Sequence, residues 1–500
     1  MDSDSTRWLK LRSGSEIRGP EPQLTDERAE KLGFAFACWL AERRGRAPDD
    51  LVLAVGRDPR PSGARIKAAL TRGITAADCD VLDCGLCPAP ALFKTLQPDC
   101  GNADGAVMVT ASTADPTLNG FRFLTADGGL RDADVKEILL RAQDVQVPER
   151  LVVQHDADSL YYEGLRSAAA RCLEDDALKP LLGMRVVVDA RSSVGQGYAR
   201  FLEALGVETE GSLYPLGDED GIAEGPDDAR AVDAVARAVK AVRADLGVLF
   251  NADGSRAAIV DDGGRLIAQN RLIALAAAML LDQQPGATLV TDSVTSSGLS
   301  AFIAEWGGIH YRFKRGYRSV IDEAIRLNAE GIDCPLAIET SGHAAFRDNG
   351  FVDDGIYLAT RVICEALNRK REGLSVFSLI DDLQEPVESL ELRLPVLDAE
   401  DPSAASQEVV ETLLSYTLDN PRWQIAPDSR EGVRITFNLD GGVNNAWFQL
   451  RMSVHDPVMV LNAESDVAGG VKRILSALYN LIQDSQSLEL TPLRLAAGRD

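Results

Sequence analysis

The chain has no long hydrophobic run and no leader-like N-terminus. The absence of these two features argues against a membrane or secreted protein. Its longest apolar run, LIALAAAMLL at 272–281, is ten residues long, which is too short to cross a bilayer. The N-terminal stretch MDSDSTRWLK lacks the apolar core of a secretory signal. We therefore expect a cytoplasmic protein without a membrane partner.

Cysteine is scarce, with 8 residues scattered over 500, which gives no disulfide framework. Cys84 and Cys87 form a CxxC motif in VLDCGLCPAPAL. No second pair follows at the spacing of a zinc site. We interpret the two cysteines as small residues where a strand ends, and no metal centre is predicted from them.

Basic residues are also in short supply: 52 lysines and arginines stand against 77 aspartates and glutamates, for a net charge of −25. A chain of this charge repels nucleic-acid backbones and anionic membrane surfaces, so neither is an expected partner. A small phosphate ligand is compatible with this charge only where arginines gather locally. The positions of the arginines therefore carry information.

Strand-like and helix-like patterns alternate through most of the chain. Buried strands are predicted at 51–55, 105–112 and 244–250, and helical periodicity covers 25–44. Strands that alternate with helices of this length predict doubly wound sheets with parallel strands. In such sheets ligands bind outside the carboxyl ends of the strands, so the loops after the strands are the candidate sites.

The C-terminal segment follows another pattern. A helix at 404–417 precedes three strands, at 432–439, 446–452 and 458–464, and a helix follows at 467–482. This order predicts an α+β domain with an antiparallel sheet. The length of 500 residues is compatible with about three or four domains.

The loop FNADGSR follows the strand that ends at 250. Its oxygen-bearing side chains Asn251, Asp253 and Ser255 recur at every second residue, so an extended chain would point all three the same way. Oxygen ligands at this spacing suit a hard cation, but only one of them is a carboxylate. The loop alone is compatible with a metal site, a weakened metal site or a polar turn.

Arginines recur in the loops that follow predicted strands. Guanidinium groups pair bidentately with phosphate, which favours an anion in these loops. Surface arginines paired with the abundant acids are the alternative. The arginines concerned are Arg18, Arg57, Arg60, Arg122, Arg256, Arg315, Arg318 and Arg451.

Two further loops carry candidate reactive groups. Ser112, at the predicted strand end in TASTADPTLNGFRF, is a candidate nucleophile or phosphate carrier, with a plain turn serine as the alternative. In ETSGH, Glu339, Ser341 and His343 alternate, so all three side chains could face one ligand. His343 is a candidate general acid or base or a structural hydrogen-bonding residue.

Taken together and in chain order, these loops resemble those of the α-D-phosphohexomutase superfamily. SGSEIRG is similar to the family's TSGIRG element, and GRDPRPSG to GRDxRxSG. TASTADPTLNGFR looks like the phosphoserine loop TASHNPxxxNGxK, and FNADGSR lies where the family has its DGDxDR metal loop. ETSGH is similar to the sugar-binding GExSGH, and RMSVHDP to the phosphate-binding RPSGTEP. The resemblance covers nearly the whole chain and is closest to a divergent phosphoglucomutase-like branch.

The resemblance implies four domains around a central cleft. Three would be similar α/β domains with doubly wound mixed or parallel sheets, and the fourth an α+β domain. The implied boundaries are 1–150 for the phosphoserine domain, 151–268 for the metal-loop domain, 269–388 for the sugar-binding domain and 389–500 for the phosphate-binding domain.

The family's reaction implies roles for individual residues. Ser112 would carry a phosphoryl group that passes to a hexose phosphate, and the resulting bisphosphate would return its other phosphate to the serine. Arg18 and Arg122 would stand near the transferring group, Arg122 in place of the family lysine. Arg256 and His343 would assist proton transfer or charge stabilisation. The implied substrate-binding residues are Lys314, Arg315, Arg318, Glu339, Ser341, Arg451, Ser453 and His455.

The implied cofactors are Mg²⁺ and a hexose 1,6-bisphosphate activator. Ser112, Asn251, Asp253 and Ser255 would hold the ion, but Asn251 and Ser255 replace two family aspartates. We expect weak magnesium binding, because charge count tunes the affinity of such sites. Thr113 and Ala114 also replace the family's His-Asn.

Two functions are compatible with these residues. The first is an active phosphohexomutase of the phosphoglucomutase/phosphomannomutase type, an isomerase whose partner is a hexose phosphate. The second is a sugar-phosphate-binding pseudoenzyme with a regulatory or partner role. The residues leave open whether the hexose is glucose, mannose or glucosamine, and they leave the oligomeric state open.

Overall fold

The protein is described here by a computed structural model that covers residues 8–112, 114–147, 153–154, 157–215, 225–397, 402–420, 422–453 and 456–499. The chain forms two compact units. The first unit comprises residues 1–268 and 341–378, and the second comprises 269–340 and 379–500.

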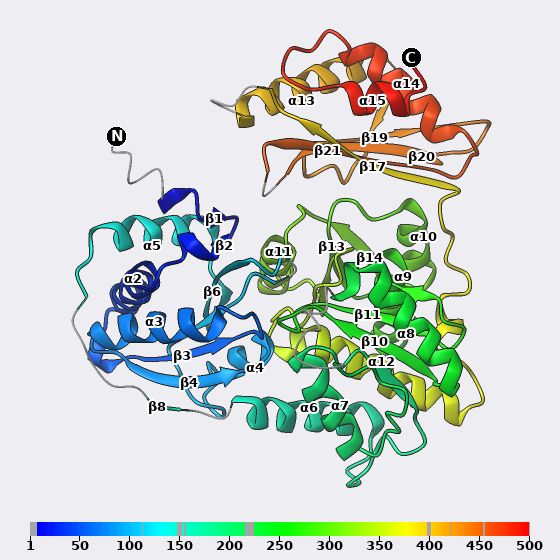
Figure 1. The fold of residues 1–500 in the computed structure, drawn as a ribbon. Coiled ribbons are helices and arrows are strands. Elements are labelled where there is room, and N and C mark those ends of the chain that lie inside the picture. Colours follow the sequence, from blue (N-terminus) through cyan, green and yellow to red (C-terminus); the bar gives the residue numbers. More distant parts are fainter. Residues whose placement is uncertain are drawn as a thin grey trace. The chain divides into compact units, whose positions relative to one another are not determined.

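The first unit begins with a mixed sheet in the order β1-β2-β6-β5-β3-β4-β8, with β7 paired to β6 (Figure 1). Parallel pairing joins β3 to β4 and β5, and antiparallel pairing joins β6 to β5 and β2. The strands are β1 (Arg12–Ser13), β2 (Glu16–Pro20), β3 (Val52–Arg57), β4 (Asp80–Leu86), β5 (Gly105–Val109), β6 (Leu118–Thr125), β7 (Gly128–Gly129) and β8 (Val153–Gln154).

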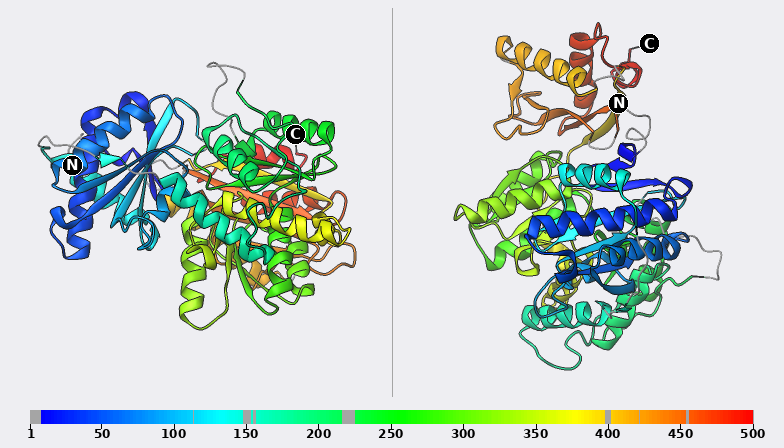
Figure 2. Two further views of the ribbon diagram at one scale, coloured as in Figure 1. Left: turned by 90° about the horizontal axis from the view of Figure 1, so that it is seen from below. Right: turned by 90° about the vertical axis from the view of Figure 1, so that its left-hand side faces the viewer.

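Helices cover both faces of this sheet. On one face, α2 (Asp26–Arg44), α3 (Gly63–Ala76) and α5 (Asp132–Asp144) share a single core with the strands, including Phe36 and Phe123. Figure 2 shows the blue helices of this group along that face. On the other face, α4 (Ala89–Lys94) packs beside the β3 backbone, where a Cβ at Gly56 would lie only 3.3 Å from Leu92.

A second sheet of the first unit has the order β12-β11-β10-β9. The pair β10–β11 is a hairpin in which Phe250 is opposite Ala257, so residues 251–256 form its loop. The strands are β9 (Val186–Val188), β10 (Leu246–Phe250), β11 (Ala257–Asp261) and β12 (Leu266–Ile267). The other elements are α6 (Ala157–Leu173), α7 (Ser193–Ala204), α8 (Ala229–Val242), β16 (Ala344–Phe346) and α12 (Gly355–Arg371).

The second unit contains a parallel arrangement and an antiparallel sheet. β13 (Thr288–Thr291) pairs in parallel with β14 (Ile309–Arg312) and β15 (Leu336–Ile338). The antiparallel sheet has the order β17-β21-β20-β19-β18. Its strands are β17 (Glu388–Pro395), β18 (Gln424–Ile425), β19 (Val433–Phe437), β20 (Ala446–Met452) and β21 (Val458–Ser465). The helices are α9 (Asn270–Gln283), α10 (Ser297–Glu305), α11 (Tyr317–Ala329), α13 (Pro402–Asp419), α14 (Gly470–Ile482) and α15 (Thr491–Ala496).

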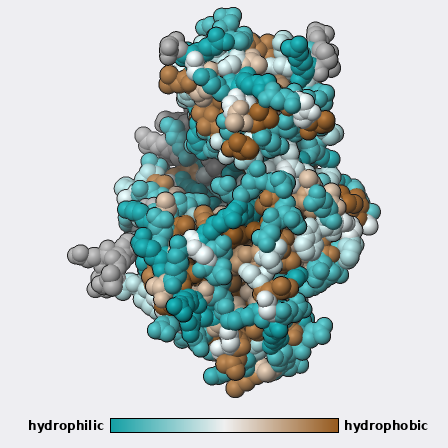
Figure 3. Space-filling view, turned by 90° about the vertical axis from the view of Figure 1, so that its right-hand side faces the viewer, coloured by the Kyte–Doolittle hydropathy of each residue, from teal (hydrophilic) through white to brown (hydrophobic). Residues whose placement is uncertain are grey.

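The predicted fold class is confirmed: α/β regions with mixed or parallel sheets precede an antiparallel α+β region. The predicted strand at 105–112 is shorter than expected, since β5 ends at Val109. The four domain boundaries stay a prediction. None of the helices in the described ranges is long and apolar enough to cross a membrane. On the face drawn in Figure 3, hydrophilic residues predominate and hydrophobic ones form small groups, in keeping with a charged fraction of 26%.

Candidate active site

Ser112 lies three residues beyond β5, in a backbone conformation that serine seldom adopts. Its φ is +53°, in the left-handed region that costs a non-glycine residue about 1 kcal/mol or more. The Ser112 N–H donates to the Thr110 hydroxyl at 2.9 Å, which helps to hold this conformation. The Ser112 residue is only 8% exposed, so its hydroxyl is positioned by the fold.

The buried side chain of Arg60 stabilises the loop around Ser112 through hydrogen bonds. Its guanidinium donates to the carbonyl oxygens of the loop residues Ser112, Ala114 and Asp115 and of Leu118, the first residue of β6, each at 2.8 Å. The Arg60 Nε donates to Asp58 at 3.1 Å, and the Thr110 hydroxyl donates to the same carboxylate at 2.7 Å.

Arg60 was expected among the arginines that face an anion, and the structure corrects that interpretation. The Arg60 side chain is 1% exposed, and its donors are taken by main-chain oxygens and Asp58. The residue therefore acts as internal support for the loop.

The hairpin loop after β10 meets this serine. The Asn251 amide nitrogen donates to Ser112 Oγ at 3.0 Å and to Ser255 Oγ at 3.1 Å. The Asn251 oxygen accepts from the backbone N–H of Arg256 at 3.0 Å. Since a backbone N–H can only donate, this contact fixes the amide orientation. Asn251 thus presents a hydrogen-bond donor, rather than an oxygen, to the serine.

Asp253 supplies the one carboxylate of this loop. Its Oδ1 accepts from the hydroxyl of Ser255 at 2.7 Å and from the Ser255 N–H at 3.1 Å. Its Oδ2 is buried and has no hydrogen-bond partner among the described residues. A buried carboxylate oxygen without a donor is costly unless a cation satisfies it.

The residues around Asp253 fit a magnesium ion in part. Carboxylate and hydroxyl oxygens are ligands that Mg²⁺ accepts, and Asp253, Ser255 and Ser112 provide them. Asn251 would have to turn its amide to offer an oxygen. No group of three or more His, Cys, Asp or Glu side chains suited to a metal occurs in the described part of the chain, so this site carries little charge.

Arg122 and His343 meet at a buried carboxylate that the motifs did not single out. One Arg122 nitrogen, Nη2, donates to both oxygens of Asp353 at 2.6 Å, and His343 Nε2 lies 3.8 Å from Asp353 Oδ2. Burial raises the pKa of Asp353 to about 6, while the Arg122 charge opposes this and the Asp253 charge adds to it. Two of the predicted catalytic residues are therefore positioned by Asp353.

The stability of the protein should depend on pH through Asp353. Its folded pKa of about 6 lies above the ordinary value of 3.8. The carboxyl therefore contributes stability fully below pH 4, and this contribution is lost as the pH rises through 6. From pH 4 to 7, the free energy of unfolding of the wild type should fall relative to Asp353→Asn by at most about 3 kcal/mol. Urea denaturation of both proteins measures this, and a difference that rises with pH would contradict it.

Arg256 joins the hairpin loop to the ETSGH segment. Its Nη1 donates to the Ser341 carbonyl at 3.1 Å, its Nη2 pairs with Asp227, and its backbone bridges that of His343. The Ser341 hydroxyl and His343 Nδ1 lie 2.9 Å apart. The structure thus brings together Ser112, Asn251, Asp253, Ser255 and Arg256, and places Ser341 and His343 beside Arg256. Arg18 pairs with Glu16 at 2.6 Å.

The remaining predicted residues lie in the second unit. The Glu339 carboxylate accepts the Gly316 N–H at 2.6 Å, and Arg318 pairs with Asp322 at 2.5 Å. Lys314 and Arg315 lie in the loop after β14. Arg451 is in β20 and Ser453 directly follows that strand. His455 lies outside the described residues.

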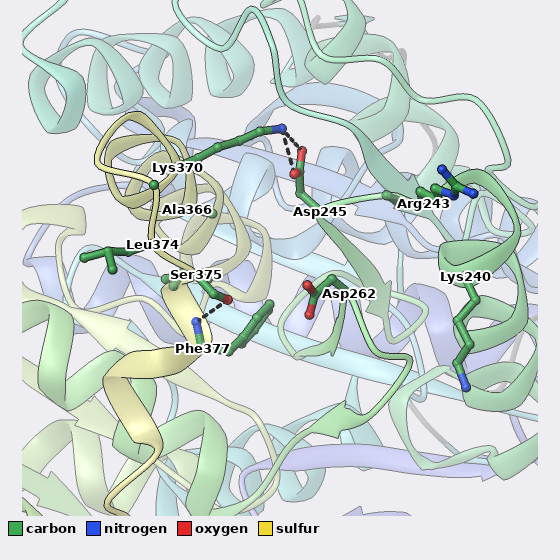
Figure 4. A pocket seen from close by; sticks show the side chains of 12 residues that line it. Lys240, Arg243, Asp245, Asp262, Ala366, Lys370, Leu374, Ser375 and Phe377 are labelled. Carbon is green, nitrogen blue, oxygen red and sulfur yellow. Dashed lines mark hydrogen bonds and ion pairs between the residues drawn. The ribbon is translucent and has the colours of Figure 1, made fainter.

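A groove of about 600 Å³ lies elsewhere in the first unit (Figure 4). Its cations include Lys240, Arg243 and Lys370, and Leu374 and Phe377 supply apolar surface. Lys370 is already paired with Asp245 at 2.7 Å. No predicted site residue lines this groove, so it carries no part of the site described above.

Sequence reasoning missed Asp353, Arg60 as a support, and Glu431, which contacts Arg315 in the second unit. The doublet in FVDDG was the only available signal for Asp353. Arg60 was visible in GRDPRPSG, although its contacts were not. The eight cysteines are free thiols, and burial raises the pKa of Cys84 to about 12.

Comparison with known proteins places these features in one family. A model described as phosphoglucomutase/phosphomannomutase, alpha/beta/alpha domain I, matches residues 10–145. The corresponding model of domain III matches residues 268–386. Together the two models span just over half of the chain.

Individual proteins are similar over two thirds of the chain or more. The chain is 29% identical to the Pseudomonas aeruginosa phosphomannomutase/phosphoglucomutase over 465 residues, 91% of this chain and 93% of that protein. It is 32% identical to the Corynebacterium glutamicum phosphoglucosamine mutase over 352 residues, 66% of this chain and 73% of that protein. A solved phosphoglucomutase/phosphomannomutase family protein from Burkholderia thailandensis shares the fold with a TM-score of 0.78 and 24% identity, covering 98% of this chain and 100% of that one.

Two more distant structures contain ligands. The Aspergillus fumigatus N-acetylphosphoglucosamine mutase was solved with GlcNAc-6P and magnesium, with a TM-score of 0.59 and 13% identity over 97% of this chain and 98% of that one. A variant of that enzyme was solved with glucose 1,6-bisphosphate, with a TM-score of 0.56 and 14% identity over the same shares. At this identity the likeness shows the fold alone.

Proposed function

The chain belongs to the α-D-phosphohexomutase superfamily, and from this premise we propose that it is a phosphohexomutase. It moves a phosphoryl group between the 1- and 6-positions of a hexose phosphate by way of phosphoserine at Ser112 and a bisphosphate intermediate. The observation that carries this proposal is the contact of Ser112 Oγ with the Asn251 amide, 3.0 Å away, in the loop that also holds Asp253.

In the transfer step, the P–Oγ bond of phosphoserine breaks and a bond forms between phosphorus and a sugar hydroxyl oxygen. The hydroxyl proton leaves toward His343 and passes on to solvent, and Ser112 Oγ takes up one proton from solvent, so that the protons balance. The Asn251 N–H group stabilises negative charge that develops on Oγ, because a positioned donor costs no reorganisation at that moment. The second half of the reaction repeats these changes in reverse at the other position of the sugar.

Arginines of the first unit neutralise the transferring group. Arg122 and Arg18 are the proposed partners, and Arg256 assists. Asp353 keeps Arg122 in place through its contacts at 2.6 Å. Positioning and charge neutralisation dominate phosphoryl transfer, so these residues act mainly through geometry and charge.

Recognition of the substrate is assigned to the remaining loops. We propose that Glu339 and Ser341 bind sugar hydroxyls, and that Arg451, Ser453 and His455 bind the non-reacting phosphate. Lys314, Arg315 and Arg318 add positive charge. The boundaries 1–150, 151–268, 269–388 and 389–500 are proposed for the phosphoserine, metal-loop, sugar-binding and phosphate-binding domains.

Magnesium is proposed as a weakly held cofactor, and a hexose 1,6-bisphosphate as activator. Asp253, Ser255 and Ser112 would hold the ion, joined by Asn251 if its amide turns. When bound, magnesium neutralises charge on the phosphoryl oxygens. The buried Oδ2 of Asp253, which has no hydrogen bond to any residue that the structure describes, supports this assignment.

Turnover can be tested directly. Purified protein is incubated with magnesium, glucose 1-phosphate and a trace of glucose 1,6-bisphosphate, and glucose 6-phosphate is followed. Mannose and glucosamine phosphates are run in parallel to identify the hexose. Turnover with any of them, and phosphate on Ser112 by mass spectrometry, are expected. If both are absent, the protein is not a mutase, and the alternative of a sugar-phosphate-binding pseudoenzyme replaces it.

Ser255→Asp should strengthen magnesium binding by about tenfold, because it adds a carboxylate beside Asp253. Isothermal titration with magnesium measures the change without turnover, and the magnesium dependence of activity gives a second measure. Ser255→Asn, which adds no charge, is the control and should stay near the wild-type affinity. An unchanged affinity in Ser255→Asp would mean that the ion does not bind at this loop.

A further inference from the structure

A carboxylate lies among the cations of the second unit that the proposed function assigns to phosphate binding. Glu431 stands two residues before β19, and its Oε2 accepts from the Ser293 hydroxyl at 2.5 Å. The same oxygen accepts the backbone N–H of Arg315 at 3.1 Å and lies 3.9 Å from Arg451 Nε. One oxygen thus serves three separate segments of the unit.

Arg451 is a buried cation whose Nε is left without a hydrogen bond among the described residues. Its side chain is 5% exposed. Burial lowers the pKa of Arg451, Glu431 opposes this, and Arg315 adds to it through charge repulsion. A buried guanidinium with an unused donor is the arrangement expected where an anion binds.

Arg315 brings a second positive charge to the same place. Its Nε lies 3.8 Å from Asp292 Oδ2. Burial lowers the pKa of Arg315, but Asp292, Glu339, Glu391 and Glu431 together outweigh that effect and raise the pKa. Glu431 acts on the charge of both arginines, as Asp292 and Glu391 also do, and it contacts Arg451 Nε and the Arg315 backbone N–H through one oxygen.

We propose that Glu431 is a resident counter-anion of Arg451 and Arg315, and that the phosphate of the substrate displaces it from them. This inference rests on the proposed function and adds a residue that sets substrate affinity. Without ligand, the carboxylate neutralises the arginines and ties the start of β19 to Ser293. A phosphate dianion carries more charge than one carboxylate, so it competes successfully for the same donors.

The inference predicts the effect of removing the charge alone. In Glu431→Gln, the side-chain oxygen still accepts from Ser293 and Arg315, so the contacts within the unit persist. The repulsion between Glu431 and an incoming phosphate is lost, and Kd for phosphate ligands should fall about tenfold. The KM for glucose 1-phosphate should fall in parallel without a rise in kcat, since a tightly held product leaves slowly.

Calorimetric titration of the full-length protein with inorganic phosphate, and then with glucose 1-phosphate, measures Kd. Asp440→Asn is the matched control: Asp440 is an exposed acid in the same unit, paired with Arg473 at 2.9 Å, and its removal should leave Kd within twofold. Glu431→Asp retains the charge and should stay nearer to wild type than Glu431→Gln. Thermal melting verifies that each variant is folded.

If folded Glu431→Gln has an unchanged or higher Kd for phosphate, the inference is overturned. Glu431 would then serve only to connect segments of the second unit. Equal gains in affinity for Glu431→Gln and Glu431→Asp would overturn it too, because charge would then not be the cause. The titration with phosphate needs no turnover. One outcome is that neither the wild type nor any variant converts glucose 1-phosphate, while Glu431→Gln still binds phosphate more tightly than the wild type does. In that case the proposed reaction is wrong and the counter-anion role of Glu431 stands.

Discussion

Replacing Ser112 by alanine is expected to lower turnover by at least about 10³-fold, because the group that carries the phosphoryl is lost. The side chains around it should stay in place: Asn251 loses one acceptor but keeps Ser255, and Arg60 binds the Ser112 carbonyl rather than its hydroxyl. Activity with glucose 1-phosphate, and the mass of the 112-containing peptide before and after incubation with glucose 1,6-bisphosphate, give the result.

The matched control is Ser167→Ala, in which an exposed serine of α6 is changed and full activity is expected. Thermal melting should show Ser112→Ala to be about as stable as the wild type. Turnover within tenfold of the wild type, or a stable phosphate on another residue in the variant, would show that Ser112 is not the carrier.

Replacing Arg60 by alanine should have the largest effect on stability. The change leaves Asp58 without its charge partner and removes donors from four carbonyl oxygens. Removing one partner from a buried ion pair typically costs about 3–5 kcal/mol. The free energy of unfolding from urea denaturation at pH 7 measures this loss.

Arg65→Ala is the control for Arg60→Ala. Arg65 lies in α3, is 41% exposed and pairs with Glu21 and Asp26. Its loss should cost at most about 1 kcal/mol, as surface ion pairs contribute little. A loss below 1 kcal/mol for Arg60→Ala would mean that water replaces its donors and that the loop does not depend on it.

The element pattern was largely predictable from the sequence, since buried strands and amphipathic helices have periods that local composition displays. Strand β20 (Ala446–Met452) begins and ends where the pattern placed it, and β10 (Leu246–Phe250) ends there but begins two residues later than predicted. The predicted strand end at Ser112 was wrong by three residues. A positive φ at a serine is imposed by Thr110 and Arg60, and local composition does not display such contacts.

The site was predictable in its loops and less so in its contacts. Arg122 meets Asp353, 231 positions away in the chain, and no spacing rule connects residues that far apart. The orientation of Asn251 was equally hidden. The sequence predicted that Asn251, Asp253 and Ser255 direct three oxygens to one point. In the structure, the Asn251 oxygen accepts from the backbone N–H of Arg256, so the Asn251 amide nitrogen faces Ser112. Residue types indicated the chemistry, and the direction of each group followed from its neighbours.

The hydrogen bonds of Arg60 to the loop affect which amino-acid substitutions this chain can accept during evolution. Its guanidinium binds main-chain oxygens at Ser112, Ala114, Asp115 and Leu118, and every amino acid has such an oxygen. Side chains in this stretch can therefore be exchanged without altering the path of the backbone. Ala114 stands where related loops have asparagine, yet its carbonyl is still held. The loop therefore tolerates amino-acid substitutions, because Arg60 hydrogen-bonds only to its backbone carbonyl oxygens.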